Sequence, residues 1–211
     1  SLGCYVAAFR LPAYPHRDEL DFVSYNVPGR QVARVTMRDG ETLVLLIYRS
    51  DLIEGDPAPD RRKAALRQTF DGMAWETPEI LAHMDAVDEL YFDRVSQIHL
   101  DQWSSGRVAL VGDAAACVSL LAGEGTGLAI IEAYVLAGEL HRAGGDVARA
   151  LDVYHQRLHR FVRQKQRAAF RFRGFFAPKT SGALALRNAA MRLLAVPFFT
   201  RHVFAGAFGD R

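Results

Sequence analysis

The feature that most constrains the fold of this chain is the ordered stretch at residues 103–129. An apolar strand is expected to run into Gly112-Asp113, small residues follow, and a Gly-x-Gly-x-Gly run at residues 123–127 precedes an apolar helix. Glycines let a ligand approach the backbone closely, and the free N–H groups at a helix start favour an anion or a polar ring edge. The Asp113 carboxylate, at the carboxyl end of a strand, can accept hydrogen bonds from ligand hydroxyls, as in open α/β sheets. The pattern fits a ligand site, and it fits equally a turn that Asp113 caps, with glycines that only bend the chain.

The first 52 residues carry β signals. The segments Gln31–Arg38 and Thr42–Arg49 are rich in β-forming residues, and Asp39-Gly40 between them is a strong hairpin signal. Pro28-Gly29 marks another tight turn. These signals predict an antiparallel meander. The strands expected along the whole chain are residues 3–10, 20–27, 31–38, 42–49, 91–100 and 107–111.

The remaining segments carry helix signals. Thr77-Pro78 fits a helix start with Thr as N-cap, and Gly144-Gly145 fits a helix end. Asp146 is expected to cap a long helix that Pro178 ends. The other expected helices are residues 60–70, 77–87, 125–143 and 181–195. Strands followed by helices in this order predict an α+β fold.

The charge is unevenly distributed along the chain. The whole chain has a formal net charge of +2, but residues 151–211 contain ten Arg and two Lys against two Asp. This basic region could contact anionic lipid, nucleic acid or an acidic partner. The basic residues alternate with Phe and Leu, which favours a solvated helix that packs on the acidic remainder of the chain.

Cysteines and histidines indicate neither a disulfide framework nor a metal centre. Cys4 and Cys117 form no Cys-x-x-Cys pair, and their small number is typical of a reducing cytoplasm. His155 and His159 have the spacing of two ligands on one helix face, but a solvated face is the simpler interpretation. No apolar run reaches about 18 residues, so no membrane-spanning helix is expected.

The segment at residues 106–115 resembles a known cofactor-binding motif. Its sequence, Gly-Arg-Val-Ala-Leu-Val-Gly-Asp-Ala-Ala, is similar to the second flavin fingerprint of the group A flavoprotein monooxygenases, the para-hydroxybenzoate-hydroxylase-like superfamily. The resemblance implies that Asp113 binds the ribityl chain of FAD. It also implies that the loop from Leu121 to Gly127 runs beside the pyrimidine edge of the flavin ring. The cofactor-binding residues that it implies are Gly112, Asp113, Ala115, Leu121, Ala122, Gly123, Glu124, Gly125, Thr126 and Gly127.

Some motifs of that superfamily differ here or are not found. Ala116 stands where many members have His, and Val118 and Leu120 lie where a proline usually shapes the loop. Neither the Gly-x-Gly-x-x-Gly segment that binds ADP nor the middle Asp-Gly motif occurs in the chain. We therefore expect these residues to be the carboxy-terminal part of such an enzyme. The expected parts are a substrate-binding sheet domain with two helices (1–100), the end of a Rossmann-like FAD-binding domain (101–145) and a helical region (146–211).

The resemblance also implies an activity. The expected function is an FAD- and NAD(P)H-dependent hydroxylation of an aromatic or polyketide-like small molecule, in the cytoplasm and without nucleic acid. Two alternatives remain open: a flavin-dependent reductase of an isoprenoid lipid, which the basic, apolar carboxy-terminal region would suit through peripheral membrane contact, and a non-catalytic binding remnant. No catalytic side chain is expected, because the flavin performs the oxygen chemistry and the protein orients the reactants.

Substrate-contacting residues are expected on the sheet. The candidates are Tyr25, Leu46 and Tyr48, and ordinary core packing is the competing interpretation for each of them.

Overall fold

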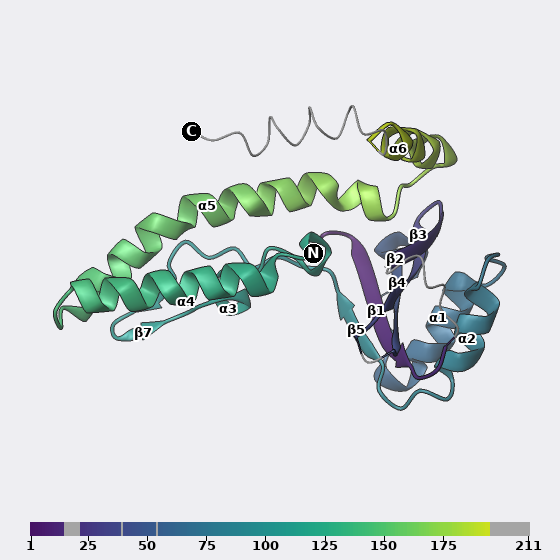
Figure 1. Cartoon of the computed structure of the whole chain (residues 1–211), viewed down its shortest axis with the longest axis horizontal. Helices are drawn as coiled ribbons and strands as arrows, with labels where there is room; N and C mark the ends of the chain where they lie inside the picture. The colour runs from purple at the N-terminus through teal and green to yellow at the C-terminus, as the bar shows by residue number, and fades with distance from the viewer. Residues whose placement is uncertain (15–21, 39, 54, 195–211) are drawn as a thin grey trace. The chain divides into compact units, whose positions relative to one another are not determined.

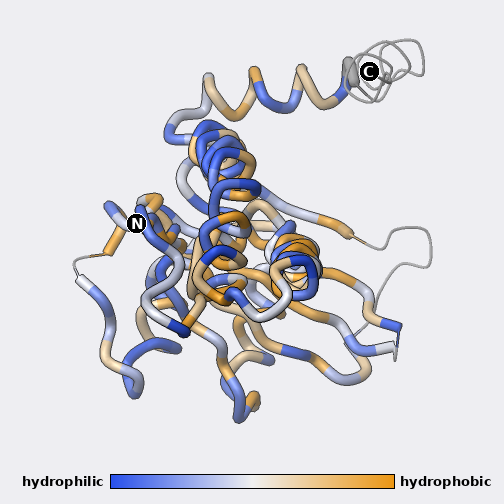
Figure 2. Tube along the Cα trace, turned by 90° about the vertical axis from the view of Figure 1, so that its left-hand side faces the viewer, coloured by the Kyte–Doolittle hydropathy of each residue, from blue (hydrophilic) through white to orange (hydrophobic). Residues whose placement is uncertain are grey.

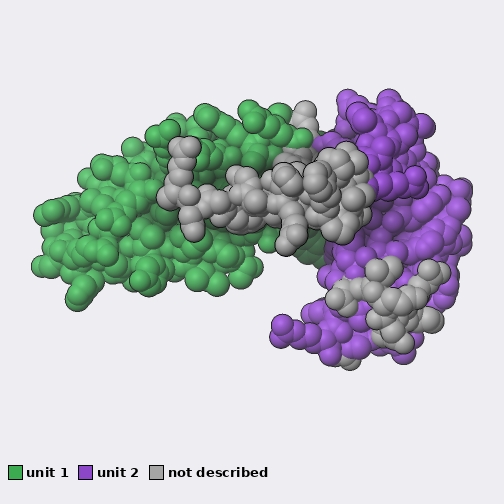
Figure 3. Space-filling view, turned by 45° about the horizontal axis from the view of Figure 1, so that its top comes forward, with its two compact units in different colours: residues 1–7, 91–173 green, residues 8–90, 174–211 purple. Residues whose placement is uncertain are grey.

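The computed structural model describes residues 1–14, 22–38, 40–53 and 55–194, and its α+β architecture confirms the fold class expected from the sequence (Figure 1). The chain divides into two compact units (Figure 3). Unit 1 comprises residues 1–7 and 91–173, and unit 2 comprises residues 8–90 and 174–211. Strand β1 (Cys4–Leu11) begins in unit 1 and ends in unit 2. The three parts expected from the sequence (1–100, 101–145 and 146–211) are a functional division, which differs from these compact units. That division stays a prediction.

Unit 2 is built on the antiparallel meander that the turn signals predict. Strands β2 (Phe22–Val27), β3 (Arg30–Thr36) and β4 (Thr42–Arg49) pair in sequence within a sheet of order β2-β3-β4-β1-β5. The two-residue turn before β3 places Gly29 at φ +76°, a conformation that glycine adopts without strain. Met37 N–H donates to the Glu41 carbonyl at 2.8 Å and closes the second hairpin.

Helices cover one face of this meander. Two 3₁₀ turns (Ser50–Leu52 and Pro59–Arg61) lead into α1 (Arg62–Phe70), and α2 (Thr77–Met84) follows. The Tyr48 ring packs edge-on against Phe70 of α1, with 6.1 Å between ring centroids. On the same face, the buried Arg34 forms a 2.8 Å ion pair with Glu76, which also accepts a hydrogen bond from the Tyr14 hydroxyl at 3.2 Å. This face is therefore the hydrophobic core of unit 2, stabilised by one buried charge pair.

Unit 1 is mostly helical. After β5 (Tyr91–Arg94), its elements are β6 (Ser104–Ser105), β7 (Val108–Ala109), α3 (Asp113–Ala116), a 3₁₀ turn (Leu120–Ala122), α4 (Gly125–Arg142) and α5 (Val147–Phe176). Its core joins Trp103 to Leu128 of α4 and to Tyr154 and Leu158 of α5. Hydrophobic and hydrophilic residues alternate along the helical turns (Figure 2). The amphipathic spacing of α5 thus turns its apolar side to α4.

Several expected boundaries were wrong. The strand expected over 107–111 forms ladder pairs only at Val108–Ala109, opposite Ser104–Ser105. The strand expected over 91–100 ends at Arg94, although Val95 N–H still donates to the Cys4 carbonyl at 2.9 Å. Ladder pairing needs a neighbouring strand, and apolar composition alone does not reveal where that neighbour ends. In α2, Thr77 is a buried first helical residue and Glu76 is the N-cap.

The carboxy-terminal helices follow the capping signals. Arg149 N–H donates to the Asp146 carboxylate at 3.1 Å, which confirms the expected cap of α5. That helix ends at Phe176, two residues before Pro178, whose carbonyl accepts a hydrogen bond from Gly29 N–H at 2.7 Å. Helix α6 (Ser181–Leu194) follows. Parts of the expected elements at residues 20–21, 39 and 195, and the rest of the basic region to residue 211, lie outside the described residues.

Among the helices that the structure describes, none combines the length and the apolar character needed to cross a bilayer.

Candidate flavin-binding site

Unit 1 contains a surface pocket of about 810 Å³, a size typical of small-molecule sites. Five segments form its walls: β1 at Val6, β5 with the residues that follow it, the turn between β7 and α3, the loop after α3, and the start of α4. Five of the ten residues that the resemblance assigns to a cofactor line this pocket. They are Gly112, Asp113, Gly123, Gly125 and Thr126.

Gly112 is held tightly at the base of the pocket. Its φ is +67°, and a Cβ added here would lie only 3.2 Å from the Cβ of Ala129 in α4. Its N–H donates to Glu132 Oε2 at 2.5 Å, and its carbonyl accepts from Ala115 N–H and Ala116 N–H at 3.0 Å. Both the backbone conformation and the close approach of α4 therefore require glycine here.

Asp113 begins α3 and lies next to the start of α4. A Cβ added to Gly125 would lie 3.7 Å from Asp113 Oδ1, so the carboxylate and the helix start share one wall of the pocket. Burial, and then the nearby Asp113 carboxylate, raise the pKa of the Cys117 thiol. Cys117 therefore stays a protonated, packed thiol rather than a nucleophile.

The start of α4 presents backbone N–H groups to the pocket. Leu128 N–H makes the first-turn bond, to the Glu124 carbonyl at 3.0 Å, so the N–H groups of residues 125–127 precede the intrahelical ladder. Gly123 has φ +65° and open space around it, whereas Gly125 has an ordinary helical conformation. Gly123 thus turns the chain into the helix, and Gly125 leaves room beside Asp113.

The other five assigned residues do not line the pocket. Ala115 is fully buried and Ala122 packs against the core of unit 1. Glu124 is bonded to Lys165 at 2.9 Å, and Gly127 continues α4. The side chain of Leu121 lies outside the described residues. That these five residues bind a cofactor stays a prediction.

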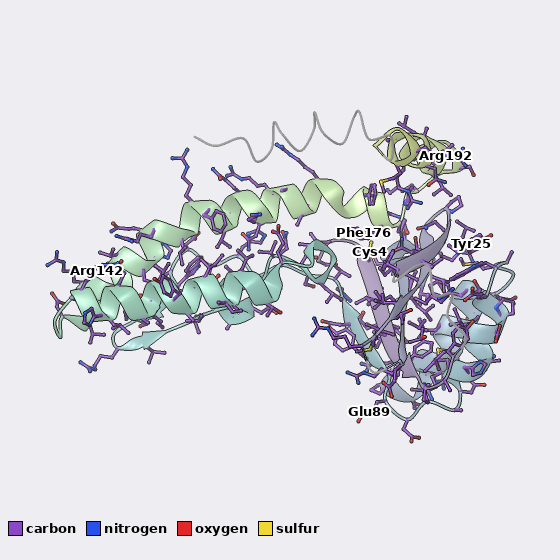
Figure 4. The ribbon with its side chains drawn as sticks, in the orientation of Figure 1. Cys4, Tyr25, Glu89, Arg142, Phe176 and Arg192 are labelled. Atoms are coloured by element: carbon purple, nitrogen blue, oxygen red, sulfur yellow. The ribbon has the colours of Figure 1, made fainter. Side chains whose placement is uncertain are left out.

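The three substrate candidates lie together on the helix-facing side of the sheet in unit 2. Leu46 and Tyr48 are fully buried, and Tyr25 packs near Trp75 with ring centroids 6.1 Å apart (Figure 4). Core packing accounts for Leu46 and Tyr48, which expose no surface for a ligand. Of the three, Tyr25 alone is partly exposed.

Sequence reasoning missed the part of the pocket wall that β5 forms. Tyr91, Asp93 and Arg94 of β5 line it. The Tyr91 hydroxyl donates to Asp93 Oδ2 at 3.2 Å, and Arg94 donates to the Tyr5 hydroxyl at 3.0 Å. Burial, and then the Asp93 carboxylate, raise the pKa of Tyr91, so its phenol remains a hydrogen-bond donor at neutral pH. No local sequence signal linked this short strand to the pocket.

The two histidines with metal-like spacing pack against a tryptophan. The His155 and His159 rings lie 5.2 and 5.9 Å from the Trp103 ring between centroids. Within the described residues, no group of three or more His, Cys, Asp or Glu side chains could hold a metal ion.

Comparison with known families identifies the class of protein. Residues 2–169 match the family described as "FAD binding domain". The chain belongs to this FAD-binding domain family.

Curated relatives extend the similarity to named enzymes. The chain is 36% identical over 167 residues to a flavin-dependent monooxygenase of an unknown prokaryotic organism, covering 79% of this chain and 43% of that protein. It is 35% identical over 176 residues to a flavin-dependent monooxygenase of Legionella longbeachae, again covering 79% of this chain and 43% of the relative. The chain therefore spans less than half the length of these relatives.

Solved structures share the fold. The tetracycline destructase Tet(51) superposes with a TM-score of 0.73 at 29% identity, covering 92% of this chain and 52% of that one. Klebsiella pneumoniae HpxO, solved with FAD and uric acid, superposes with a TM-score of 0.70 at 20% identity, covering 89% of this chain and 48% of that one. The similarity to HpxO, at 20% identity, shows a shared fold alone.

Proposed function

We propose that this chain supplies the ribityl- and ring-side part of the FAD site in an FAD- and NAD(P)H-dependent monooxygenase. The observation that carries the proposal is the Asp113 carboxylate beside the first turn of α4 within one pocket. Family membership and the flavin-dependent monooxygenase relatives support the same assignment.

The residues of the pocket suit the two polar parts of a flavin. Asp113 is an acceptor for ribityl hydroxyls, and a hydrogen bond to an ionised acceptor is stronger than a neutral one. The N–H groups at the start of α4, near Thr126, carry the positive end of the helix dipole and stabilise negative charge on the ring. Bound FAD, once reduced, supplies the electrons and activates O₂ for oxygen transfer. The protein binds and orients the reactants.

The proposed substrate is an aromatic or polyketide-like small molecule. The name of one similar structure supports this class, since it is a tetracycline destructase. The wall formed by Tyr91 and Asp93, with a neutral phenol beside a carboxylate, offers a donor and an acceptor for hydroxyl and carbonyl groups.

The test is oxygen incorporation by the full-length protein. Purified protein is supplied with FAD, NADH or NADPH, ¹⁸O₂ and a panel of aromatic polyketides that includes tetracyclines. The expected result is substrate-stimulated NAD(P)H oxidation and a product that carries one ¹⁸O atom. Asp113→Ala, supplied with FAD at the same concentration, should lose activity because less flavin is bound.

Two other outcomes correspond to the alternatives. A product that gains hydrogen without ¹⁸O would favour the flavin-dependent reductase, for which isoprenoid lipids are a separate substrate panel. Binding of FAD with no NAD(P)H oxidation on any panel would favour a non-catalytic binding protein.

A cytoplasmic location and peripheral membrane contact stay predictions. On α5, Arg157, Arg160, Arg167 and Arg171 are exposed, which supports contact with anionic lipid. Co-sedimentation with phosphatidylserine vesicles, but not with phosphatidylcholine vesicles, is the expected result.

A further inference from the structure

Glu132 is a buried acid that sequence reasoning did not assign to the site. It lies in α4, its residue is only 1% exposed, and its Oε2 accepts the hydrogen bond from Gly112 N–H. Among the described residues, no Lys, Arg or His forms an ion pair with it. Burying a carboxylate without a counter-charge is costly, so packing alone does not account for an acid at this position.

Helix α4 fixes Gly112 at two points. Ala129 and Glu132 are one turn apart on the same face of the helix. The first approaches the Gly112 Cα so closely that a Cβ would stand 3.2 Å away, and the second binds the Gly112 N–H. Because Gly112 directly precedes Asp113, these two contacts set the direction in which the chain presents the Asp113 side chain.

A side chain of helix α5 holds the backbone just before Gly112. The fully buried Tyr154 donates its hydroxyl to the Leu110 carbonyl at 3.1 Å. Burial, and then the neighbouring Glu132 carboxylate, raise the pKa of Tyr154, so the hydroxyl keeps the proton that it donates. The segment Leu110–Gly112 is thus held by side chains of both helices.

We propose that Glu132 is a positioning residue of the flavin site: its carboxylate holds the Gly112 backbone and thereby places the Asp113 carboxylate against the start of α4. The inference rests on the proposed function, because it takes FAD as the ligand of Asp113. FAD binding by the wild-type protein tests that function, and the comparison of variants tests the role of Glu132.

The same helix offers a matched control. Glu139 lies two turns after Glu132 in α4 and is 5% exposed. It pairs with Arg142 at 2.7 Å and Arg157 at 3.2 Å, near the carboxy-terminal end of the helix, where Arg142 is its last residue (Figure 4). Its removal affects the packing of α4 without loosening Gly112.

The experiment compares three variants of the full-length apoprotein by FAD titration, with melting temperature and flavin reduction potential measured in parallel. Glu132→Leu removes the acceptor, and we expect FAD to bind about ten- to a hundredfold more weakly and its potential to shift. Glu132→Gln keeps an oxygen acceptor and should restore binding to within about threefold of wild type. Glu139→Leu should lower the melting temperature and leave FAD affinity and potential unchanged.

A double-mutant cycle with Asp113→Ala separates positioning from general stability. If Glu132 acts through Asp113, Glu132→Leu adds little in the Asp113→Ala background, whereas independent effects add. Should Glu132→Leu fail to fold, Glu132→Asp replaces it, because the shorter side chain keeps the charge but withdraws the acceptor from Gly112. FAD binding as tight as wild type in the folded Leu or Asp variant, or full additivity, would overturn the role of Glu132. A wild-type protein that binds no FAD would instead overturn the proposed function.

Discussion

Two buried charged residues, Arg34 in unit 2 and Glu132 in unit 1, are stabilised in different ways. In unit 2, the buried Arg34 forms an ion pair with Glu76, which also accepts a hydrogen bond from the Tyr14 hydroxyl. In unit 1, the buried Glu132 is bonded to the Gly112 backbone, next to an Asp113 carboxylate that lines a pocket.

This difference separates a scaffold from a site. Removing one partner of a buried ion pair destabilises the fold, and a closed pair offers no group to a ligand. The contacts from Glu132 to Gly112, by contrast, lead to the Asp113 carboxylate and the start of α4. These polar groups line the pocket and can bind a ligand. Substitutions in unit 2 should therefore change the free energy of unfolding, and substitutions near Gly112 should change flavin binding.

The largest expected effect is a loss of stability in unit 2. Glu76→Gln leaves the Arg34 charge buried without its partner, which costs about 3 kcal/mol of unfolding free energy. Urea denaturation of the full-length protein measures this cost, with the exposed Glu79→Gln of α2 as a control near wild type. The FAD affinity of the folded fraction should not change, and a parallel loss of affinity would contradict the separation of the two regions.

The next effect is on flavin binding in unit 1. Asp113→Ala removes a charged acceptor and should weaken FAD binding by about 1.5–3 kcal/mol. Titration of the apoprotein with FAD measures it, and Asp152→Ala on the exposed side of α5 is the matched control. Unchanged affinity would mean that Asp113 serves only the turn into α3.

Gly123 and Gly125, at the start of α4, should respond differently to substitution. Gly123→Ala forces an alanine to φ +65° in open space, so it should cost about 1 kcal/mol of stability through backbone strain. Gly125→Ala puts its Cβ in ordinary contact with Asp113, whereas the branched Gly125→Val should also weaken FAD binding by crowding the pocket. Melting temperature and FAD affinity distinguish these effects, and identical profiles for Gly123→Ala and Gly125→Val would contradict the assignment.

The smallest expected effect is a pH-dependent change in stability at Glu132. Burial, and then the Asp113 carboxylate, raise the pKa of Glu132, while the hydrogen bond from Gly112 N–H opposes that rise. Because the folded state holds the proton more tightly than the unfolded state, the wild type loses stability as pH rises from the unfolded pKa through the folded one. Glu132→Gln does not titrate, so its melting temperature should exceed that of wild type at neutral pH, by under about 4 °C.

The pH dependence of this melting-temperature difference can contradict the prediction. The difference between Glu132→Gln and wild type should vanish in acid, below the unfolded pKa of a glutamate. A difference that grows as pH falls would mean that the Glu132 carboxylate is stabilised, rather than penalised, by its surroundings.

Local signals predicted much of the fold. Gly29 and Gly40 lie in the expected hairpins at positive φ, Asp146 caps α5, and Pro178 follows its end, because turn and cap chemistry depends on a few adjacent residues. The lengths of β5 and β7 depend on partner strands, which local composition does not reveal.

The site was predictable in part for a similar reason. The Gly112-Asp113 motif and the glycines of the α4 start occur in one continuous stretch, and five of the assigned residues line the pocket. Tyr91 and Asp93 reach the same pocket from a distant segment, so only the tertiary fold brings them there. Glu132 carried a local signal, as one of two acids in the largely apolar α4, but its partner is a backbone N–H that no sequence motif encodes.

The most direct test of the account is hydrogen–deuterium exchange of the full-length apoprotein with and without FAD. We predict that FAD slows exchange in residues 112–116 and 123–128 of unit 1, where the Asp113 turn and the start of α4 line the pocket. Strands β3 and β4 of unit 2 should exchange at the same rate in both states. Protection by FAD that leaves residues 112–128 unchanged would contradict the placement of the flavin at this site.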